Sequence, residues 1–407
     1  MVAINILIIN HYAGSREMGM EYRHFYLARE LVNMGHKVTI IAASFSHLRG
    51  QNPLPDHQFQ ETVEDGVSFV WIKTPPYYRN NLLRVRNVAV FLSALRVHSK
   101  RLARQYKPDV VVASSTYLLD IYPAARIARH AGAKVVFELH DVWPLSLVEL
   151  YDFSPNHPLI RMLAQTERSS YTIADAVVSI LPGATLRAQE LGIANKKITH
   201  VPNGISVDNN RVDTISRAQQ QLLVLKGQNI FTVVYVGGFA QANALETIVE
   251  SCKLLPKGIA VVLVGKGERK NELMSLASKS GLRNLYFEEY VPKAQTFGVL
   301  ESADCLYIGA RASMLYRYGI GMNKLYDYML AAKPILFGID APDNEVSECG
   351  CGICIEPENA KALADAIVQL KTMSPAKREE MGQRGRDYVL KHRNYHTLAQ
   401  RFIDAVQ

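Results

Sequence analysis

Short, nearly continuous runs of valine and isoleucine alternate with helical patterns along almost all of the 407-residue chain. Apolar runs without polar interruptions are typical of parallel strands, because helices cover both faces of a parallel sheet. Such runs include NILIIN, KVTIIAAS and PDVVVAS in the first half, and the pattern restarts with FTVVYVGG at Phe231. The alternation predicts an α/β protein with two doubly wound, Rossmann-like domains that face each other across a cleft.

The domain boundary is expected at a Pro-Asn-Gly turn, which is followed by a polar stretch that suits a linker with a helix. We therefore place an N-terminal Rossmann-like domain at residues 1–205 and a C-terminal one at residues 206–392. The final helix, within residues 393–407, is expected to pack back on the first domain. Ligands of such sheets bind at the carboxyl ends of the strands, so the loops that follow strands are the places to look for function.

The sequence predicts a cytoplasmic protein. Met1 leads directly into an apolar strand, without the charged and then apolar segments of a signal peptide. No run of about 18 apolar residues is present, so we expect no membrane-spanning helix. Cys349, Cys351 and Cys354 lie close together in CGCGIC. Zinc would need a fourth ligand, so a Gly-rich turn that enters a strand is the preferred interpretation.

The most informative loop is RYGIGMNKLYDYMLAAKPI, in which two glycines and an Asn-Lys pair precede an amphipathic helical run. The free N–H groups and the dipole at a helix start attract anions. Gly319 and Gly321 allow the backbone to approach a phosphate, and Lys324 adds a full positive charge. Met322 and Asn323 lie at the helix start and supply N–H groups. The alternative is an ordinary helix start with a solvated lysine.

Further motifs extend this interpretation to the whole chain. They are INHYAGSREMGMEYRHFYLARELVNMGHKVTIIAAS, ELHDVWP, VPNGI, GGFAQANALETIVESCKLL, GKGERK, GMNKLYDYMLAAKPI and MGQRGRDYVLKH. In order and spacing they resemble the retaining glycosyltransferases of family 4, which have the two-Rossmann GT-B fold. The most similar subgroup makes bacterial O-antigens and capsules and includes N-acetylfucosaminyl transferases. The resemblance implies a nucleotide-sugar donor bound mainly by the second domain and an acceptor bound mainly by the first.

The second domain departs from the family pattern where the donor diphosphate binds. The family carries an Arg and, five residues later, a Lys, whereas this chain has Gly238 and Asn243. The family also has two glutamates eight positions apart. The second, which binds the ribose hydroxyls, corresponds to Asp327, and the first corresponds to Gly319. We infer that Lys324 replaces the missing cations, because related O-antigen enzymes resemble this variant.

Two more segments of the second domain are candidates for donor contact. In GKGERK, Lys266 could add charge near the donor, although a tight turn explains its two glycines equally well. EEYVPKAQ resembles the family segment whose backbone contacts the base. This resemblance makes Tyr290 and Val291 donor contacts, with uridine as the usual base of the subgroup.

In the first domain, FELHDVWP places His140 just past a strand end. The resemblance puts this histidine near the donor sugar as a catalytic residue, and a histidine that bonds only to the protein is the alternative. The loop HYAGSREMGMEYR follows the first strand, so Gly14, Gly19, Glu21 and Arg23 are candidates for contact with the acceptor or a phosphate. The alternative is that Glu21 caps the first helical turn and Arg23 lies on the surface.

The chemistry is expected to need no metal and no cofactor besides the UDP-sugar substrate. The chain lacks the D-x-D motif with which other glycosyltransferases hold a divalent ion, so Lys, Arg and helix starts must neutralise the diphosphate. No residue is placed as a nucleophile, which favours retaining transfer in which a donor phosphate oxygen takes the acceptor proton. A non-hydrolysing UDP-sugar epimerase shares this architecture, and a catalytically silent sugar-binding partner is a third alternative.

Charge predicts one further partner. The net charge is +8, and the stretch from Lys73 to Lys107 has nine Lys or Arg and no Asp or Glu. Apolar residues recur there at helical spacing from Arg84 onward, after the pair Tyr77 and Tyr78. We expect peripheral contact with anionic lipid on the inner face of the plasma membrane, which would bring the protein to an acceptor on an undecaprenyl-type lipid. The alternative is a helix whose apolar stripe faces the sheet. Nucleic acid is not expected, because aromatic residues do not interleave with the basic ones.

Overall fold

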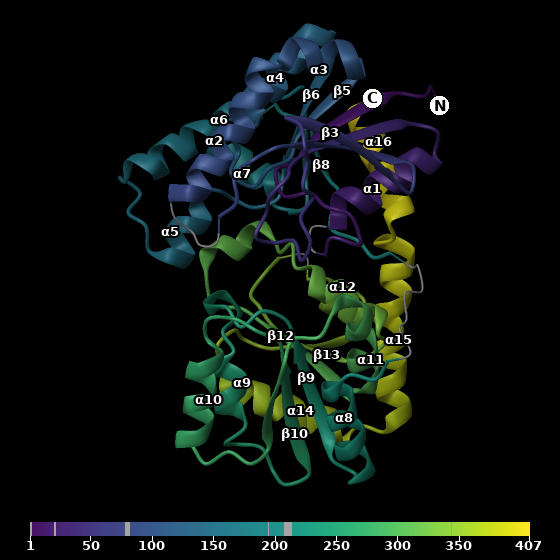
Figure 1. Cartoon of the computed structure of the whole chain (residues 1–407). Coiled ribbons are helices and arrows are strands. Elements are labelled where there is room, and N and C mark those ends of the chain that lie inside the picture. The colour runs from purple at the N-terminus through teal and green to yellow at the C-terminus, as the bar shows by residue number, and fades with distance from the viewer. Residues whose placement is uncertain (1, 20–21, 78–81, 194, 207–213, 343) are drawn as a thin grey trace. The chain divides into compact units, whose positions relative to one another are not determined.

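The computed structural model describes the chain except for residues 1, 20–21, 78–81, 194, 207–213 and 343. Two of the residues singled out above, Glu21 and Tyr78, lie outside the described residues. The chain divides into two compact units. One consists of Met1–Asn203 with Tyr395–Gln407, and the other consists of Gly204–Asn394. Each unit contains a sheet of mainly parallel strands covered by helices, which confirms the predicted α/β class of two Rossmann-like domains (Figure 1).

The first domain is built on an eight-stranded sheet with the order β3-β4-β2-β1-β5-β6-β7-β8. Neighbouring strands are parallel except β3 and β4, which form an antiparallel pair at one edge. The antiparallel pair was not predicted, because β3 is a largely exposed strand without a Val and Ile run. The strands are β1 (Asn5–Ile9), β2 (Lys37–Ala43), β3 (Phe59–Glu64), β4 (Val67–Ile72), β5 (Val110–Ala113), β6 (Lys134–Leu139), β7 (Ala176–Ser179) and β8 (Ile198–His200).

Helices bury both faces of this sheet. Phe91, Leu102 and Ile127 join an apolar cluster on one face, and Phe25 and Phe402 join a cluster on the other. The last helix of the chain therefore completes the core of the first domain. The helices are α1 (Tyr22–Asn33), α2 (Leu82–Val97), α3 (Ser99–Tyr106), α4 (Ile121–Ala131), α5 (Leu145–Tyr151), α6 (Pro158–Ile173), α7 (Ala184–Glu190) and α16 (Tyr395–Val406).

The second domain has a six-stranded parallel sheet with the order β11-β10-β9-β12-β13-β14. Its strands are β9 (Phe231–Val236), β10 (Ile259–Val264), β11 (Leu285–Glu288), β12 (Cys305–Gly309), β13 (Ile335–Gly338) and β14 (Gly352–Cys354). Its helices are α8 (Arg217–Gly227), η1 (Gln241–Asn243), α9 (Glu246–Ser251), α10 (Lys270–Lys279), α11 (Lys293–Ser302), η2 (Met314–Tyr318), α12 (Asn323–Leu330), α13 (Glu345–Glu348), α14 (Ala360–Thr372) and α15 (Pro375–His392).

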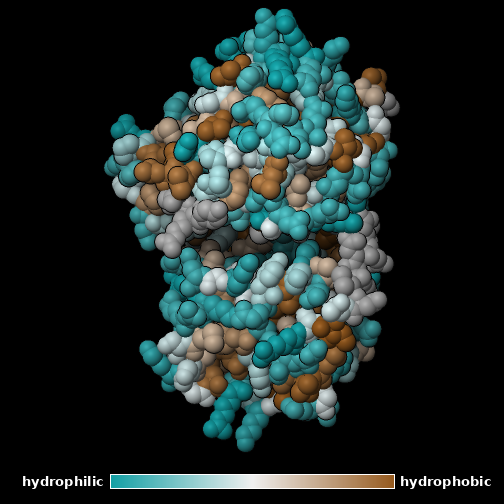
Figure 2. All heavy atoms as spheres, viewed as in Figure 1, coloured by the Kyte–Doolittle hydropathy of each residue, from teal (hydrophilic) through white to brown (hydrophobic). Residues whose placement is uncertain are grey.

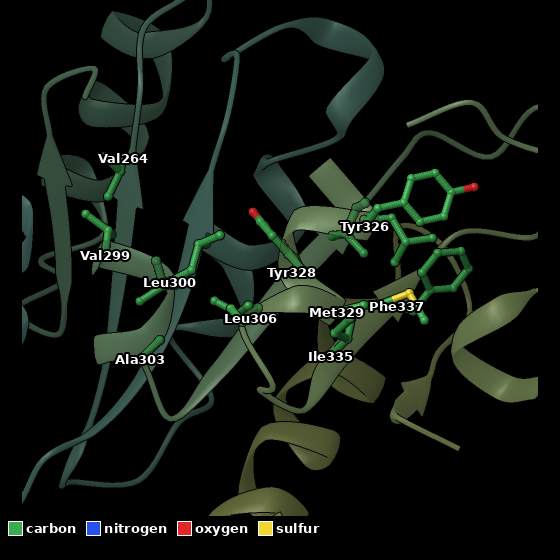
Figure 3. Close-up of a cluster of buried hydrophobic side chains, with 14 of the residues drawn as sticks. Val264, Val299, Leu300, Ala303, Leu306, Tyr326, Tyr328, Met329, Ile335 and Phe337 are labelled. Atoms are coloured by element: carbon green, nitrogen blue, oxygen red, sulfur yellow. The ribbon is translucent and has the colours of Figure 1, made fainter. Parts of the chain in front are cut away.

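One apolar cluster of this domain fixes the position of α12 (Figure 3). Tyr328 and Met329 pack from α12 against Leu306 of β12 and Ile335 of β13. The hydroxyl of Tyr328 also accepts a hydrogen bond from the Val236 N–H at 2.8 Å and lies 3.1 Å from the Val236 carbonyl oxygen. Helix α12 is therefore tied through Tyr328 to the carboxyl end of β9, a central strand of the sheet.

Gly382 marks a close crossing of α15 over the segment between α12 and β13. A Cβ atom at this buried position would lie 2.0 Å from the Ala332 carbonyl oxygen and 2.8 Å from the Lys333 nitrogen. Both contacts are with backbone atoms, so a side chain at residue 382 requires the backbone to move. Only glycine fits this crossing.

Replacing Gly382 with Ala should therefore destabilise the second domain by about 1–3 kcal/mol, the range for inserting an atom into a packed core. Gly227→Ala is the matched control. It lies at the end of α8 and a Cβ there meets nothing within 4 Å, so the change should be neutral or stabilising by up to about 1 kcal/mol. Urea unfolding followed by circular dichroism measures both, and equal midpoints for the two variants would contradict the prediction.

Candidate active site

In the second domain the structure brings Lys324 beside two residues that lie 81 and 89 positions earlier in the sequence. The Lys324 ammonium donates hydrogen bonds to the Asn243 side-chain oxygen at 2.7 Å and to the Tyr235 hydroxyl at 3.0 Å. The Asn243 amide nitrogen in turn donates to the Gly238 carbonyl oxygen at 2.9 Å. The cation of α12 thus lies beside the two residues that stand where the family pattern has its Arg and Lys. The alternative of a solvated lysine is wrong for the ligand-free protein.

Lys324 is a cation among neutral neighbours. Loss of hydration lowers the pKa of Lys324 to about 7. Burial also raises the pKa of Tyr235 above its ordinary value, so that hydroxyl stays neutral. Within the described part of the chain, no carboxylate lies at ion-pair distance from Lys324. An anion placed here would favour the charged form of the amine.

The loop before α12 has the backbone that the sequence predicted for an anion site. Gly319 has φ of +94°, a left-handed value that glycine adopts without strain. Met322 is the N-cap residue in extended conformation and makes no side-chain cap hydrogen bond, and the exposed Asn323 begins the helix. The Leu325 N–H donates to the Met322 carbonyl oxygen, but in the described part of the chain the N–H groups of Asn323 and Lys324 have no protein acceptor and are available to a ligand.

The glycines of GKGERK have a packing role. A Cβ at Gly265 would lie 1.9 Å from the Gly237 carbonyl oxygen, and one at Gly267 would lie 2.5 Å from the Phe239 carbonyl oxygen. The tight-turn interpretation therefore explains both glycines. Between them, the exposed Lys266 extends over the ring of Tyr290, with 4.5 Å from ammonium to ring centroid.

The remaining donor candidates lie near the start of α11. Asp327 forms an ion pair with Lys293, and Val291 is buried in the core. The Asp327 carboxylate therefore has a cationic partner in the ligand-free protein. A ribose hydroxyl would have to join or displace that pair.

Sequence reasoning missed one cation of this region. Arg311 follows the end of β12, and its backbone N–H donates to the Ala242 carbonyl oxygen at 3.1 Å. In the amide orientation of Gln241 that satisfies both groups, the Arg311 guanidinium donates to the Gln241 side-chain oxygen at 2.7 Å. A charged residue two positions after an apolar strand was the signal that could have identified it.

In the first domain, His140 belongs to a cluster of buried polar residues at the ends of β5 and β6. The His140 Nε2 atom lies 3.1 Å from Glu138 Oε2 and 2.9 Å from Ser114 Oγ. Ser114 Oγ donates to the same carboxylate oxygen at 2.5 Å. The His24 Nε2 atom, from α1, lies 2.6 Å from Ser114 Oγ and 3.2 Å from Glu138 Oε2. Three side chains therefore meet at one oxygen of the Glu138 carboxylate.

Arg23 compensates the charge of this carboxylate. Its Nε and NH2 groups donate to Glu138 Oε1 at 3.1 and 2.9 Å, and its guanidinium also donates to the carbonyl oxygens of Val201 and Pro202. Burial alone would raise the pKa of Glu138, but the charge of Arg23 and the contacts with both histidines outweigh it and hold that pKa well below its ordinary value. Arg23 is buried, so the alternative of a surface position is wrong.

These residues also include the one group of the described chain that meets the geometric criteria for a metal site. Ligand atoms of His24, Glu138 and His140 lie within 4.8 Å of one another. The donor set fits a metal poorly, because Arg23 already neutralises the carboxylate and a divalent ion would add uncompensated charge in a buried place. None of the cysteines of CGCGIC belongs to this group.

The glycines of the first loop are explained by packing. A Cβ at Gly14 would lie 3.1 Å from the Arg49 side chain, which is buried and donates to the Ala13 carbonyl oxygen. Gly19 has φ of +71°, which favours glycine. Both glycines therefore shape the loop, and neither has a side chain that could bind a ligand.

The chain resembles known glycosyltransferases in both halves. Residues 18–204 match a glycosyl transferase 4-like domain, and residues 230–372 match glycosyl transferases group 1. Over 362 residues it is 23% identical to a putative colanic acid biosynthesis glycosyl transferase, WcaI, of Escherichia coli K12, with 83% of this chain and 85% of that protein covered. Over 403 residues it is 22% identical to a probable glycosyltransferase, WbjE, of Pseudomonas aeruginosa, with 94% and 95% covered. Its fold is similar to that of Anabaena HepE solved with UDP, with a TM-score of 0.69 at 14% identity over 98% and 99% of the two chains.

The low pKa of Lys324 gives a testable dependence of stability on pH. Between the folded pKa of about 7 and the ordinary value of 10.5, the unfolded chain binds more protons than the folded one, so this group makes stability rise with pH. Lys324→Met removes the effect. The melting temperature of the variant relative to the parent should therefore be higher at pH 6.5 than at pH 9.

Differential scanning fluorimetry of the ligand-free protein at these two pH values measures the difference. Lys361→Met is the control, because Lys361 is an exposed lysine paired with Asp365 on α14. The melting temperature of Lys361→Met relative to the parent should be the same at the two pH values. If the melting temperature of Lys324→Met relative to the parent is also the same at both pH values, the Lys324 amine is not desolvated.

Proposed function

The chain carries the two domains of a family 4/1 GT-B glycosyltransferase, and from this premise we propose that it transfers a sugar from a UDP-sugar to a lipid-linked glycan. The product belongs to a bacterial surface polysaccharide, such as an O-antigen or capsule. The name of the relative from Escherichia coli, which refers to colanic acid biosynthesis, supports this class of product. The UDP complex of the similar Anabaena fold supports a uridine nucleotide as the donor.

The position of Lys324 carries this proposal. A leaving nucleoside diphosphate must be stabilised as its negative charge develops, and fixed cations and N–H groups provide the largest stabilisation of this kind. Lys324 lies at the start of α12 beside Asn243 and Gly238, among neutral groups. We assign Lys324, the N–H groups of α12 and the nearby Arg311 to the diphosphate, with no metal ion in the site.

The rest of the mechanism follows the retaining pattern. A donor phosphate oxygen takes the proton of the acceptor hydroxyl on the face from which the diphosphate leaves, so no protein nucleophile is required. The Asp327 carboxylate takes the ribose hydroxyls, and Tyr290 and Val291 lie along the base. His140 contacts a sugar hydroxyl. The sugar is an N-acetylated one, as the subgroup resemblance implies.

An assay with a panel of UDP-N-acetyl sugars and a lipid-linked acceptor tests the function. We expect UDP release with glycolipid formation, unchanged in excess EDTA. Lys324→Met should lower kcat by about a hundredfold or more, the loss seen when one preorganised charge donor is removed. Lys361→Met, an exposed lysine of the same domain, should keep the parent rate.

Each other outcome has a distinct meaning. An epimerised sugar without UDP release would replace transfer by epimerisation, and binding without either product would indicate a silent partner. Loss of turnover in EDTA that magnesium or manganese restores would contradict the metal-free diphosphate site. Turnover of Lys324→Met within about threefold of the parent would place the stabilising charge elsewhere.

We also propose that the first domain contacts anionic membrane, through a smaller surface than the sequence predicted. Phe91, Leu95 and Leu102 are buried, so their stripe faces the sheet and the packed-helix alternative is right for them. Tyr77 is buried as well, which removes it from lipid contact. No helix in the described part of the chain has both the length and the apolar character to cross a bilayer.

The surface that remains is the start of α2 with the basic residues that follow. Exposed apolar side chains begin the helix, and Figure 2 shows brown, apolar atoms gathered over the part of the first domain where α2 and α5 lie. Apolar groups can enter the lipid boundary while cations meet anionic headgroups, at roughly 1 kcal/mol for each cation. The residues are Leu82, Leu83 and Val85 with Arg86, Arg96, Lys100, Arg101 and Arg104.

Sedimentation with vesicles of anionic or neutral lipid tests this surface. We expect binding to anionic vesicles at low salt, and we expect Leu82→Ser with Val85→Ser to lower the partition coefficient by about a hundredfold or more, because full burial of each side chain contributes about 1.5–3 kcal/mol. The control is Leu223→Ser with Val224→Ser, an exposed apolar pair on α8 of the second domain. Equal recovery of the parent in the supernatant with both lipids would remove the membrane proposal.

A further inference from the structure

Glu138 is a buried carboxylate in direct contact with the histidine that the proposed function assigns to substrate. The side chain of Glu138 is 1% exposed, as is that of His24, whereas that of His140 is 13% exposed. One oxygen of the carboxylate faces Arg23 and the other faces Ser114 and the two histidines. The carboxylate therefore has a fixed orientation, with a separate task for each oxygen.

The hydrogen-bond protons of Glu138 and Ser114 determine which nitrogen of His140 is protonated. With Arg23 beside it, Glu138 is ionised and can only accept hydrogen bonds. Ser114 has a single hydroxyl proton, and the 2.5 Å separation between Ser114 Oγ and Glu138 Oε2 requires that proton, since two oxygens at that distance repel without one. Neither group can then donate to His140 Nε2. The Nε2 atom of His140 must carry its own proton.

The other ring nitrogen is what remains for a ligand. With Nε2–H engaged by Glu138 and Ser114, a neutral His140 has its lone pair at Nδ1. In the described part of the chain no hydrogen bond joins Nδ1 to a protein group, and the ring is the most exposed of the cluster. Nδ1 can therefore accept a hydrogen bond from a sugar hydroxyl, which always has a proton to donate.

We propose that Glu138 is a positioning residue that holds His140 as the Nε2–H tautomer, so that Nδ1 accepts a hydrogen bond from a sugar hydroxyl of the substrate. The identity of this ligand rests on the proposed function, but the tautomer does not. Arg23 and Ser114 act through Glu138, because they fix which carboxylate oxygen faces the histidine. His24 packs beside His140, with 5.2 Å between ring centroids, and limits rotation of the ring.

Glu138→Gln tests this proposal because it keeps the shape and reverses one hydrogen bond. The amide oxygen of the new side chain should face Arg23, which only donates, so the amide N–H group would face Ser114 and His140. His140 Nε2 would then become the acceptor and the proton would move to Nδ1. The sugar hydroxyl would meet an N–H group in place of a lone pair.

The matched control is Glu167→Gln, which removes another fully buried carboxylate of the same domain. Glu167 accepts from Arg187 at 2.8 and 2.6 Å and has no hydrogen bond to His140. This variant separates the loss of a buried charge from the loss of the contact with His140. Glu138→Gln keeps the oxygen acceptor of Arg23, and Glu167→Gln keeps one of the two oxygens that accept from Arg187, so both are expected to fold.

The first measurement is nuclear magnetic resonance of the full chain labelled at histidine. Ring nitrogen and carbon shifts distinguish the two neutral tautomers, and His140→Gln identifies the signal of residue 140 among the 12 histidines. At about pH 8.5 the parent and Glu167→Gln should show His140 with Nε2–H, and Glu138→Gln should show the Nδ1–H form. Nδ1–H in the parent, or an unchanged tautomer in Glu138→Gln, would overturn the proposal.

The second measurement is turnover. Glu138→Gln should lose roughly tenfold to a hundredfold in kcat/KM, the range found when a carboxylate that orients a metal-ligating histidine is removed. Glu167→Gln should stay near the parent. Should no transfer be found with any donor, the tautomer result still decides the role of Glu138, so failure of the proposed function is separate. Joint shifts of His24 and His140 on adding one equivalent of zinc chloride would show a metal site and would also overturn the proposal.

If Glu138→Gln does not fold, the His140 tautomer in Ser114→Ala tests whether Ser114 or Glu138 is responsible. It removes the proton that Ser114 gives to Glu138, so His140 Nε2–H becomes the stronger donor to the carboxylate. His140 should then keep the Nε2–H tautomer. A switch of His140 to Nδ1–H in Ser114→Ala would show that Ser114, and not Glu138, sets the tautomer.

Discussion

Removing a charge from water is costly, and the two domains meet that cost in opposite ways. In the first domain, the Glu138 carboxylate is ionised because Arg23 donates to one of its oxygens and three neutral or titratable groups surround the other. In the second domain, the Lys324 ammonium has only Asn243 and Tyr235, which are neutral, as hydrogen-bond partners. The Glu138 carboxylate is neutralised by Arg23, and it orients the three groups around its other oxygen. A charge among neutral groups has affinity left for an ion of the opposite sign.

The fold explains why these groups meet. Strands that run parallel end at the same edge of a sheet, so residues far apart in sequence become neighbours there. Arg23 and Glu138 are 115 positions apart, and Lys324 and Asn243 are 81 apart. Packing and hydrogen bonds then fix the position of α12 relative to β9. Tyr328 bonds the backbone of Val236, so the helix that carries Lys324 cannot shift along the end of β9 without losing those bonds.

The sequence predicted what depends on local pattern. Both sheets could be anticipated because their strands are continuous Val and Ile runs, and the neighbourhood of Lys324 was anticipated because the missing cations of the family had to be replaced. Contacts over long separations could not be predicted. The pairing of Arg23 with Glu138 has no signal in either motif, and the two interpretations offered for Arg23 did not include it. The stripe on α2 was ambiguous because a buried helix and a membrane-surface helix show the same period.

A lysine at position 324 affects which side chains fit at positions 238 and 243. Gly238 has no need to be glycine for its own backbone, because a Cβ built there meets nothing within 4 Å and its φ is not positive. The open space at Gly238 lies next to Asn243, which holds Lys324 through its side-chain oxygen. A long cationic side chain at residue 238 or 243 would bring a second positive charge close to Lys324, and two like charges in a partly buried place repel. The open space at Gly238 and the neutral amide of Asn243 therefore suit a lysine at the start of α12.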